Sequence, residues 1–164
     1  MMTSGKRAKD LRVERGAVAA TELSLARCAE LYMAVPAVDH GTDLFAYQAD
    51  PFRVARIQVK GTTGGLTVFR KYSLTPMIVS YVLDPLGPAD VILLTGEEAW
   101  HLPFEYIAHG GKAASHHPDN PDYRWDKAPA LLLSMLRGYL ATPERWLELF
   151  ELTAVPRLAA GEAA

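Results

Sequence analysis

The chain contains the segment Asp39-His40-Gly41-Thr42-Asp43-Leu44 and, after a short interval, the segment Ile57-Gln58-Val59-Lys60-Gly61. Both belong to apolar runs that are typical of β-strands. Because strand side chains alternate between the two faces, Gln58 and Lys60 should emerge on the same side of their strand. If the two runs pair as a hairpin, Asp43, Gln58 and Lys60 converge on one small patch. A carboxylate, an amide and an ammonium at one point suit metal-assisted hydrolysis of a phosphodiester.

The composition is that of an ordinary globular protein. The chain has 164 residues, of which 49% are hydrophobic and 22% charged, so one domain with a substantial buried core is expected. No apolar run approaches the roughly 20 residues of a membrane-spanning helix. Residues 1–15 are charged where a signal peptide needs an apolar core. The single cysteine, Cys28, excludes an internal disulfide and a cysteine-based zinc cluster. These features predict a cytoplasmic protein with no membrane contact.

The net charge of −2 argues mildly against nucleic-acid binding, because such domains usually carry a basic face. Basic residues nevertheless cluster in two places. One cluster lies within residues 1–15, where a solvated, partly disordered tail is the simplest explanation. The other surrounds the proposed site and comprises Arg53, Arg56, Lys60, Arg70 and Lys71. The local potential at the site can therefore differ from the average of the chain.

The first half of the chain predicts one helix followed by strands. A helix is expected over residues 17–32, with an inward stripe at helical spacing that comprises Val18, Glu22, Leu25, Ala29 and Tyr32. Glu22 then faces inward near the first turns, where a carboxylate also complements the helix dipole. Strands are expected at residues 33–35, 44–48, 54–59, 66–69, 78–83 and 91–94. Glu97 and Glu98 suggest a helix start, whereas residues 99–104 could close the sheet or begin a loop.

The second half predicts a connector and two helices. Residues 108–127 are polar and rich in His, Pro, Asp and Asn, which indicates an exposed loop. Residues 128–140 are apolar on most sides and predict a buried helix. Thr142-Pro143-Glu144 is a helix start with a hydroxyl cap and a proline in the first turn. The inward face of this last helix comprises Trp146, Leu149 and Phe150, and its outward face Glu144, Glu148 and Glu151.

The proposed chemistry assigns a role to each of four side chains. Magnesium held by one or two carboxylates neutralises a phosphate and activates water. Asp43 is the preferred anchor, Glu22 offers a second carboxylate from the helix, and Gln58 offers a neutral oxygen. Lys60 orients the water or stabilises developing negative charge. The simpler alternative is a surface ion pair between Asp43 and Lys60 across two strands, which is common and of little energetic consequence.

These residues carry a resemblance to a known superfamily. The run Thr21-Glu22, Asp43-Leu44 and Gln58-Val59-Lys60-Gly61 is similar to the motif of the PD-(D/E)xK nucleases. More narrowly, it resembles the Holliday-junction-resolvase-like and group I intron homing-endonuclease-like branches. Pro36 with residues 39–43 is similar to the Pro-x-x-Asp-x-Gly-x-Asp lead-in of several uncharacterised members. The resemblance covers residues 17–104. The chain departs from the commoner pattern at Gln58, where glutamate is usual, so metal affinity should be weaker.

The resemblance implies a restriction-endonuclease-like mixed β-sheet flanked by helices, with a C-terminal helical extension. It implies a single domain over residues 1–164, with a nuclease-like α/β core at 16–107, a loop at 108–127 and C-terminal helices at 128–153. Carried over by position, Asp43, Glu22 and Gln58 would bind Mg²⁺, with Mn²⁺ as the alternative ion, and Lys60 would be catalytic. The implied function is endonucleolytic hydrolysis of DNA, for which a homodimer would cut both strands. The alternative is a catalytically inactive nuclease fold that binds nucleic acid or a protein partner.

Other polar residues near these motifs have explanations besides catalysis. Asp39 is either a further acid of the site or a turn-forming residue, and the turn is the better explanation. Arg70, Lys71 and Tyr72 either contact a nucleic-acid backbone or end a solvated strand. Cys28 is expected in the core, as free cysteines commonly are.

Overall fold

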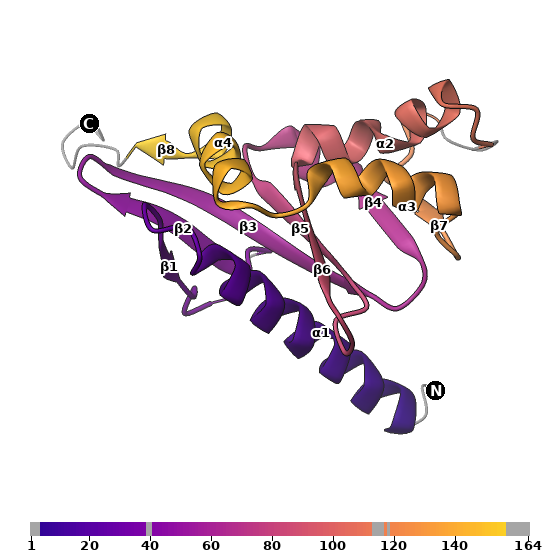
Figure 1. The fold of residues 1–164 in the computed structure, drawn as a ribbon, viewed down its shortest axis with the longest axis horizontal. Helices are drawn as coiled ribbons and strands as arrows, with labels where there is room; N and C mark the ends of the chain where they lie inside the picture. The colour runs from indigo at the N-terminus through magenta and orange to yellow at the C-terminus, as the bar shows by residue number, and fades with distance from the viewer. Residues whose placement is uncertain (1–3, 39–40, 113–116, 118, 157–164) are drawn as a thin grey trace.

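The computed structural model describes residues 4–38, 41–112, 117 and 119–156. It is a mixed α/β structure in which helices flank a mixed sheet (Figure 1). This confirms the predicted fold class at the level of a mixed sheet with helices on its two faces. No helix in the described ranges is long and apolar enough to cross a membrane.

The main sheet has the strand order β1-β2-β3-β5-β6, and only β3 and β5 are parallel neighbours. The strands β2 and β3 form the predicted antiparallel hairpin. A short strand, β8, pairs with the beginning of β3. The bounds are β1 Tyr32–Ala34, β2 Leu44–Ala49, β3 Phe52–Thr62, β5 Ile78–Leu83, β6 Asp90–Thr95 and β8 Val155–Pro156.

A second, two-stranded sheet is formed by β4 (Leu66–Phe69) and β7 (Asp122–Trp125). The 3-10 turn η1 (Arg70–Leu74) follows β4 and leads toward β5. Because β7 lies inside residues 108–127, the prediction of an uninterrupted loop there was wrong. The four residues of β7 find their partner in a strand far away in sequence, which local composition does not reveal.

The first helix, α1 (Ser4–Leu25), lies nearer the N-terminus than the predicted helix over residues 17–32. Charged residues with long unbranched side chains favour a helix whose outer face meets water. The charged segment that was interpreted as a tail is therefore helical from Ser4 onward. Its buried stripe follows i, i+4 spacing and comprises Ala17, Thr21 and Leu25.

The chain after Leu25 turns instead of continuing the helix. Backbone hydrogen bonds of the turn type run from Cys28 N to Leu25 O (2.9 Å) and from Leu31 N to Cys28 O (3.3 Å). Leu25, Cys28 and Leu31 are all buried at this three-residue spacing, whereas Ala29 and Tyr32 are exposed. The predicted stripe was therefore wrong beyond Leu25, although Cys28 does lie in the core as expected.

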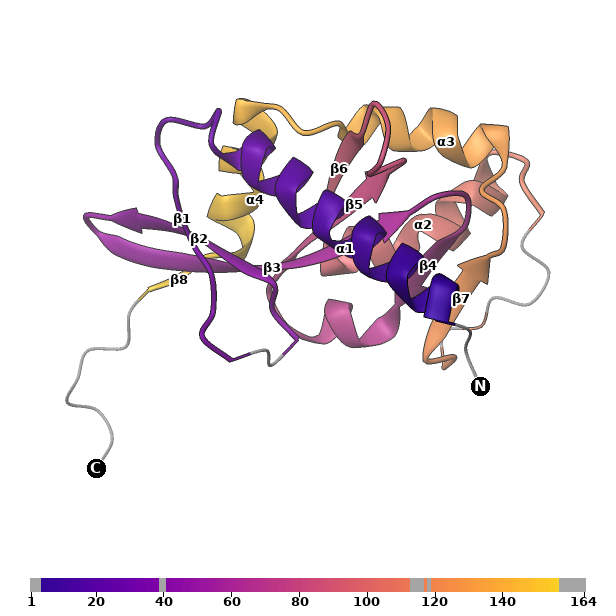
Figure 2. The same cartoon turned by 90° about the horizontal axis from the view of Figure 1, so that it is seen from below.

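The helices enclose two hydrophobic cores, one on each face of the main sheet (Figure 2). The helices α1 and α4 (Pro143–Thr153) pack on one face, and α2 (Gly96–Ala108) and α3 (Ala130–Leu136) pack on the other. The predicted start of α4 is confirmed, since the Thr142 hydroxyl accepts a hydrogen bond from Arg145 N (3.1 Å). The buried helix predicted over residues 128–140 is shorter, and the 3-10 turn η2 (Arg137–Tyr139) follows it.

The helix α2 occupies residues 99–104, where a strand or loop was expected. A reciprocal cap begins it: Glu98 N donates to the Thr95 hydroxyl (3.0 Å), and Thr95 N donates to the Glu98 carboxylate (2.7 Å). The suggestion of a helix start at Glu97 and Glu98 is thus confirmed. Pro103 lies inside this helix, although proline is unfavourable in a helix interior.

Candidate functional site

The strand β3 loses one of its neighbours at the position of Asp43. The pairing of β2 with β3 ends at Leu44 opposite Ile57, and Asp43 N still donates to Ile57 O (2.9 Å). Beyond that point β3 pairs with β5 on its other side. The side chain of Asp43 therefore lies just before the first residue of β2, next to Gln58 and Val59 of β3.

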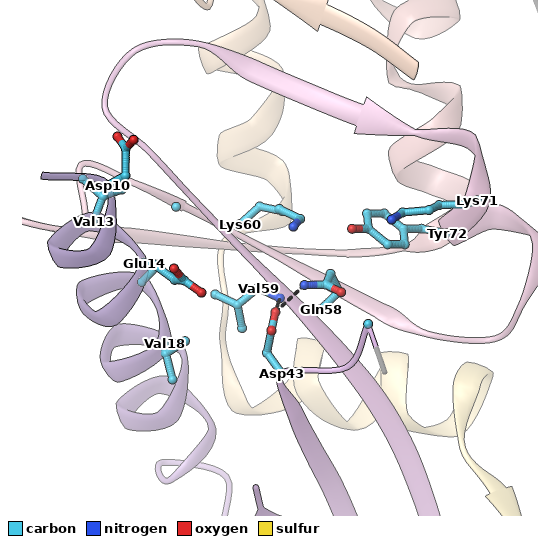
Figure 3. Close-up of a pocket in the computed structure, with 13 residues that line it drawn as sticks. Asp10, Val13, Glu14, Val18, Asp43, Gln58, Val59, Lys60, Lys71 and Tyr72 are labelled. Atoms are coloured by element: carbon cyan, nitrogen blue, oxygen red, sulfur yellow. Dashed lines mark hydrogen bonds between the residues drawn. The ribbon is translucent and has the colours of Figure 1, made fainter. Parts of the chain in front are cut away.

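A pocket of about 500 Å³ lies at this place (Figure 3). Four elements contribute to it: α1, the segment before β2, β3 and the turn η1. Its polar lining comprises Asp10, Glu14, Asp43, Gln58, Lys60, Lys71 and Tyr72. The structure thus brings together Asp43, Gln58 and Lys60, and it adds two acidic residues from α1 and two residues from η1.

The Asp43 carboxylate is held by β3. Its Oδ2 accepts hydrogen bonds from the backbone N–H of Val59 (2.6 Å) and from the side-chain amide of Gln58. Gln58 is only 6% exposed. Both hydrogen bonds use Oδ2, so they orient the carboxylate without occupying Oδ1. The described ion pairs do not include one between Asp43 and Lys60, so the simpler explanation of a surface salt bridge does not apply.

The segment that leads into Asp43 is fixed by two features. The Thr42 side chain is buried, and its hydroxyl accepts a hydrogen bond from Arg56 Nε (2.9 Å). Gly41 has φ +76°, a conformation that favours glycine. Asp39, for which a turn was predicted, lies outside the described residues, as does His40. The described part of the lead-in therefore holds Asp43 at the pocket by its own local structure.

The helix α1 supplies the acidic wall of the pocket through Asp10 and Glu14. Figure 3 shows the Glu14 carboxylate directed from α1 toward the side of the pocket where Asp43 lies. Glu22, which was predicted to contribute, does not line this pocket. It borders an adjoining depression along α1 that shares Glu14 and Val18 with the pocket. Glu14 lies one helical turn before Val18, so extending the predicted stripe backwards by one more step would have found it.

A close approach at Gly61 sets the position of α1 over β3. A β-carbon at Gly61 would lie 2.8 Å from the Ala17 β-carbon and 3.0 Å from the Val13 carbonyl oxygen. Only a residue without a side chain allows the helix to pack this closely. This contact brings the part of α1 that carries Asp10 and Glu14 to the pocket.

We expect Gly61→Ala to lower the free energy of unfolding by about 1–3 kcal/mol, because the added methyl group displaces packed atoms of α1. Gly64→Ala is the matched control, since a β-carbon there meets no atom within 4 Å. Its effect should stay within about 0.5 kcal/mol. Urea unfolding followed by circular dichroism measures both. Equal stabilities of the two variants would contradict the close contact.

The other wall of the pocket is basic and comprises Lys60 from β3 and Lys71 from η1. Neither ammonium belongs to an ion pair found among the described residues. Other basic residues predicted near the site serve different contacts: Arg53 pairs with Glu151 (2.8 Å), and Arg56 binds Thr42. The pocket therefore has carboxylates on one side and uncompensated ammonium groups on the other.

The acidic side could hold a hard divalent cation only with help from neutral ligands. Within the described residues no group of three or more His, Cys, Asp or Glu side chains is arranged to hold a metal ion. Two carboxylates, from Asp43 and Glu14, are a sufficient protein contribution for Mg²⁺, which keeps several waters. The amide nitrogen of Gln58 donates to Asp43, and its carbonyl oxygen points away from Asp43 and Glu14 (Figure 3). That oxygen could join the two carboxylates as a neutral ligand only after a rotation of the amide.

Comparison with known proteins gives no family for this chain. It matches no protein-family model, no curated protein and no solved structure. Its function must therefore be inferred from the chemistry of the pocket.

Proposed function

We propose that the chain is a metal-dependent endonuclease that hydrolyses DNA phosphodiester bonds. The observation that carries this proposal is the separation of charge within one pocket. Asp43 and Glu14 gather on one side, and Lys60 and Lys71 on the other. A divalent cation prefers the first side and a phosphate the second, so the two would meet between them.

Asp43 and Glu14 would hold the metal, with the Gln58 carbonyl oxygen as a neutral ligand. When bound, Mg²⁺ or Mn²⁺ would supply neutralisation of the phosphate charge and a more acidic water. The hydrogen bond from Val59 N keeps the Asp43 carboxylate in place (2.6 Å), which preorganises it for this role. The weaker donor strength of an amide relative to a carboxylate predicts loose metal binding.

Lys60 would bind the substrate phosphate and stabilise the negative charge that develops on it. The Lys60 side chain emerges on the same side of β3 as that of Gln58, which precedes Lys60 by two residues (Figure 3). A preorganised cation aimed at developing charge is worth most in a pocket that excludes bulk water. Lys60 is also suited to orienting an attacking water.

The PD-(D/E)xK architecture with a restriction-endonuclease-like sheet belongs to the same proposal. Its support is the order of elements around the pocket: the helix α1 with its acidic residues, Asp43 immediately before β2, and Gln58-Val59-Lys60 in β3. Glu14 would take the helical position that the sequence motif assigned to Glu22. A homodimer that cuts both strands completes the proposal, and sizing the protein with and without DNA tests it.

Replacing Glu14 by glutamine should raise the Mg²⁺ concentration for half-maximal cleavage by about tenfold or more, since even outer-shell partners of metal sites are worth 10–100-fold. Glu22→Gln removes the same charge from the same helix outside the pocket and should leave that concentration unchanged. Metal titration of cleavage measures both. A larger effect of Glu22→Gln would return the metal-binding role to Glu22.

The decisive assay uses three substrates in parallel: supercoiled plasmid, branched DNA and single-stranded DNA. We expect cleavage of at least one substrate with Mg²⁺ or Mn²⁺, no cleavage with EDTA, and no cleavage by Asp43→Ala or Lys60→Ala. Cleavage that persists in both variants would show that another site, or a contaminant, is responsible.

A second candidate function is a catalytically inactive nuclease fold that binds nucleic acid or a protein. The hydrogen bond from Gln58 to Asp43 favours it, because a glutamine that donates to the metal-binding carboxylate is suited to a site that works without a metal. The same assay separates the two. Firm binding without cleavage under any metal supports the binding module.

A further inference from the structure

The turn η1 forms a wall of the pocket with two residues, Lys71 and Tyr72, that the nuclease motif does not include. Tyr72 is only 5% exposed although it lies in a short turn between strands. Its ring packs edge-on against that of Phe69, with 5.5 Å between the ring centroids. The wall is therefore an ordered aromatic surface.

Two ammonium groups share this aromatic pair. The Lys60 Nζ lies 5.9 Å from the ring centroids of both Phe69 and Tyr72. The Lys71 Nζ lies 5.6 Å from the Phe69 centroid and 5.1 Å from that of Tyr72. All four distances fall in the range of cation–π attraction. The rings thus contact two like charges that line the same pocket, and two cations there favour an anion as the occupant.

The position of Tyr72 is set by α2. A β-carbon on Gly96, the first residue of α2, would lie 1.8 Å from the Tyr72 carbonyl oxygen. Gly96 N also donates to Met77 O (3.1 Å). This hydrogen bond ties the segment between η1 and β5 to the start of α2. The backbone of η1 therefore rests directly on the start of a helix. The aromatic wall is built into the fold and does not depend on a mobile loop.

The hydroxyl of Tyr72 is kept protonated in this setting. Burial raises its pKa above the ordinary value, and the negative charge of Asp43 raises it further, while Lys71 opposes both by its charge and by a hydrogen bond. A protonated hydroxyl next to an ammonium is a hydrogen-bond donor for an anionic oxygen. Tyr72 thus adds a hydrogen-bond donor beside Lys71 on the basic side of the pocket (Figure 3).

We propose that Lys71 and Tyr72 form a second anion-binding position, which holds a phosphate oxygen of the nucleic-acid strand beside the phosphate that Lys60 binds. This rests on the proposed function, in that the ligand is taken to be a phosphodiester chain. Two cationic positions on one wall select a strand with consecutive phosphates over a single phosphate group. Lys71 then contributes to substrate affinity, whereas Lys60 contributes to the chemical step.

The test compares Lys71→Met with Arg70→Met. Both remove one positive charge from the same turn, but Arg70 does not line the pocket. Binding of fluorescent single- and double-stranded oligonucleotides is measured in EDTA, where cleavage is absent. We expect Lys71→Met to weaken binding about 10-fold or more. The slope of the logarithm of the binding constant against the logarithm of the salt concentration should also become shallower by about one, the equivalent of one counterion fewer released. Arg70→Met should change binding about threefold or less. Tyr72→Phe, which keeps the ring, should give a smaller loss than Lys71→Met.

Each outcome decides one claim. Equal effects of Lys71→Met and Arg70→Met, or no binding by the wild-type chain at low salt, overturn the second anion position. Binding that depends on Lys71 without cleavage under any metal keeps this inference and removes the nuclease. Cleavage that depends on Lys60 with unchanged binding and KM in Lys71→Met keeps the nuclease and removes this inference.

Discussion

Lys60→Met should lower the rate of metal-dependent DNA cleavage by about 100- to 1,000-fold, the cost of removing one preorganised group that stabilises transition-state charge. The loss should fall on kcat, because under the proposed function Lys60 would act on charge that develops during the reaction. Single-turnover cleavage at saturating protein measures it directly. Methionine keeps the length and the apolar stem of the side chain, so the packing of β3 is preserved.

Lys9→Met is the control for Lys60→Met. Lys9 is an exposed lysine of α1 that does not line the pocket, so its removal changes the net charge equally and should leave cleavage within about twofold. Both variants should unfold at nearly the same denaturant concentration as the wild type, since a cation–π contact contributes only about 0.5–1 kcal/mol. A rate for Lys60→Met close to that of Lys9→Met would remove Lys60 from the mechanism.

Trp146→Ala should destabilise the protein by about 3–5 kcal/mol, the largest stability effect expected from one substitution here. Trp146 is completely buried, and its indole N–H donates to the Ser24 hydroxyl (3.0 Å), which links α4 to α1. Truncation leaves a cavity between the two helices and an unpaired hydroxyl. Thermal and urea unfolding should both show the loss.

Leu152→Ala, in the same helix, provides the matched comparison. Leu152 is 64% exposed, so its truncation should change stability by about 0.5 kcal/mol or less. Similar losses in the two variants would contradict the packing of α4 against α1. If Trp146→Ala does not fold, Trp146→Phe keeps most of the volume, and we expect it to lie between the wild type and the alanine variant.

The parts of the fold that could be predicted are those whose signals are local. The hairpin of β2 and β3 follows from two apolar runs around Asp50-Pro51, and α4 follows from the cap at Thr142 and the apolar stripe that includes Trp146. The strands β5 and β6 likewise were predicted directly from apolar runs in the sequence. In each case neighbouring residues determine the structure, because cap, turn and periodicity agree.

The parts that could not be predicted depend on distant partners. The helix α1 begins in a charged segment with no apolar stripe, and its close approach to β3 depends on the missing side chain of Gly61. The strand β7 exists because β4 pairs with it. Placing the helix start near Ala17 also left Glu14 outside the predicted helix, so Glu22 was the acidic residue that the predicted helix offered. The acidic residues of α1 that line the pocket, Asp10 and Glu14, lie in the segment that this boundary excluded.

On the basic side of the pocket, too, some residues could be placed from local sequence and others could not. Alternation along a strand was enough to place Gln58 and Lys60 on one side, and the structure brings both to the pocket with Asp43. Sequence left the role of Lys71 and Tyr72 open. Their place opposite α1 depends on the contact between the Tyr72 backbone and Gly96, a glycine that carries no recognisable motif.

Direct metal binding tests the central claim without requiring the right substrate. Electron paramagnetic resonance of Mn²⁺, titrated with the wild-type chain and with Asp43→Asn, measures the bound fraction. Asparagine keeps the shape of Asp43 and an oxygen that can accept the bond from Val59 N, so the variant should stay folded. The account predicts that the wild type binds Mn²⁺, that Mg²⁺ displaces it, and that Asp43→Asn abolishes the binding. No Mn²⁺ binding by the wild type, or equal binding by Asp43→Asn, would contradict it.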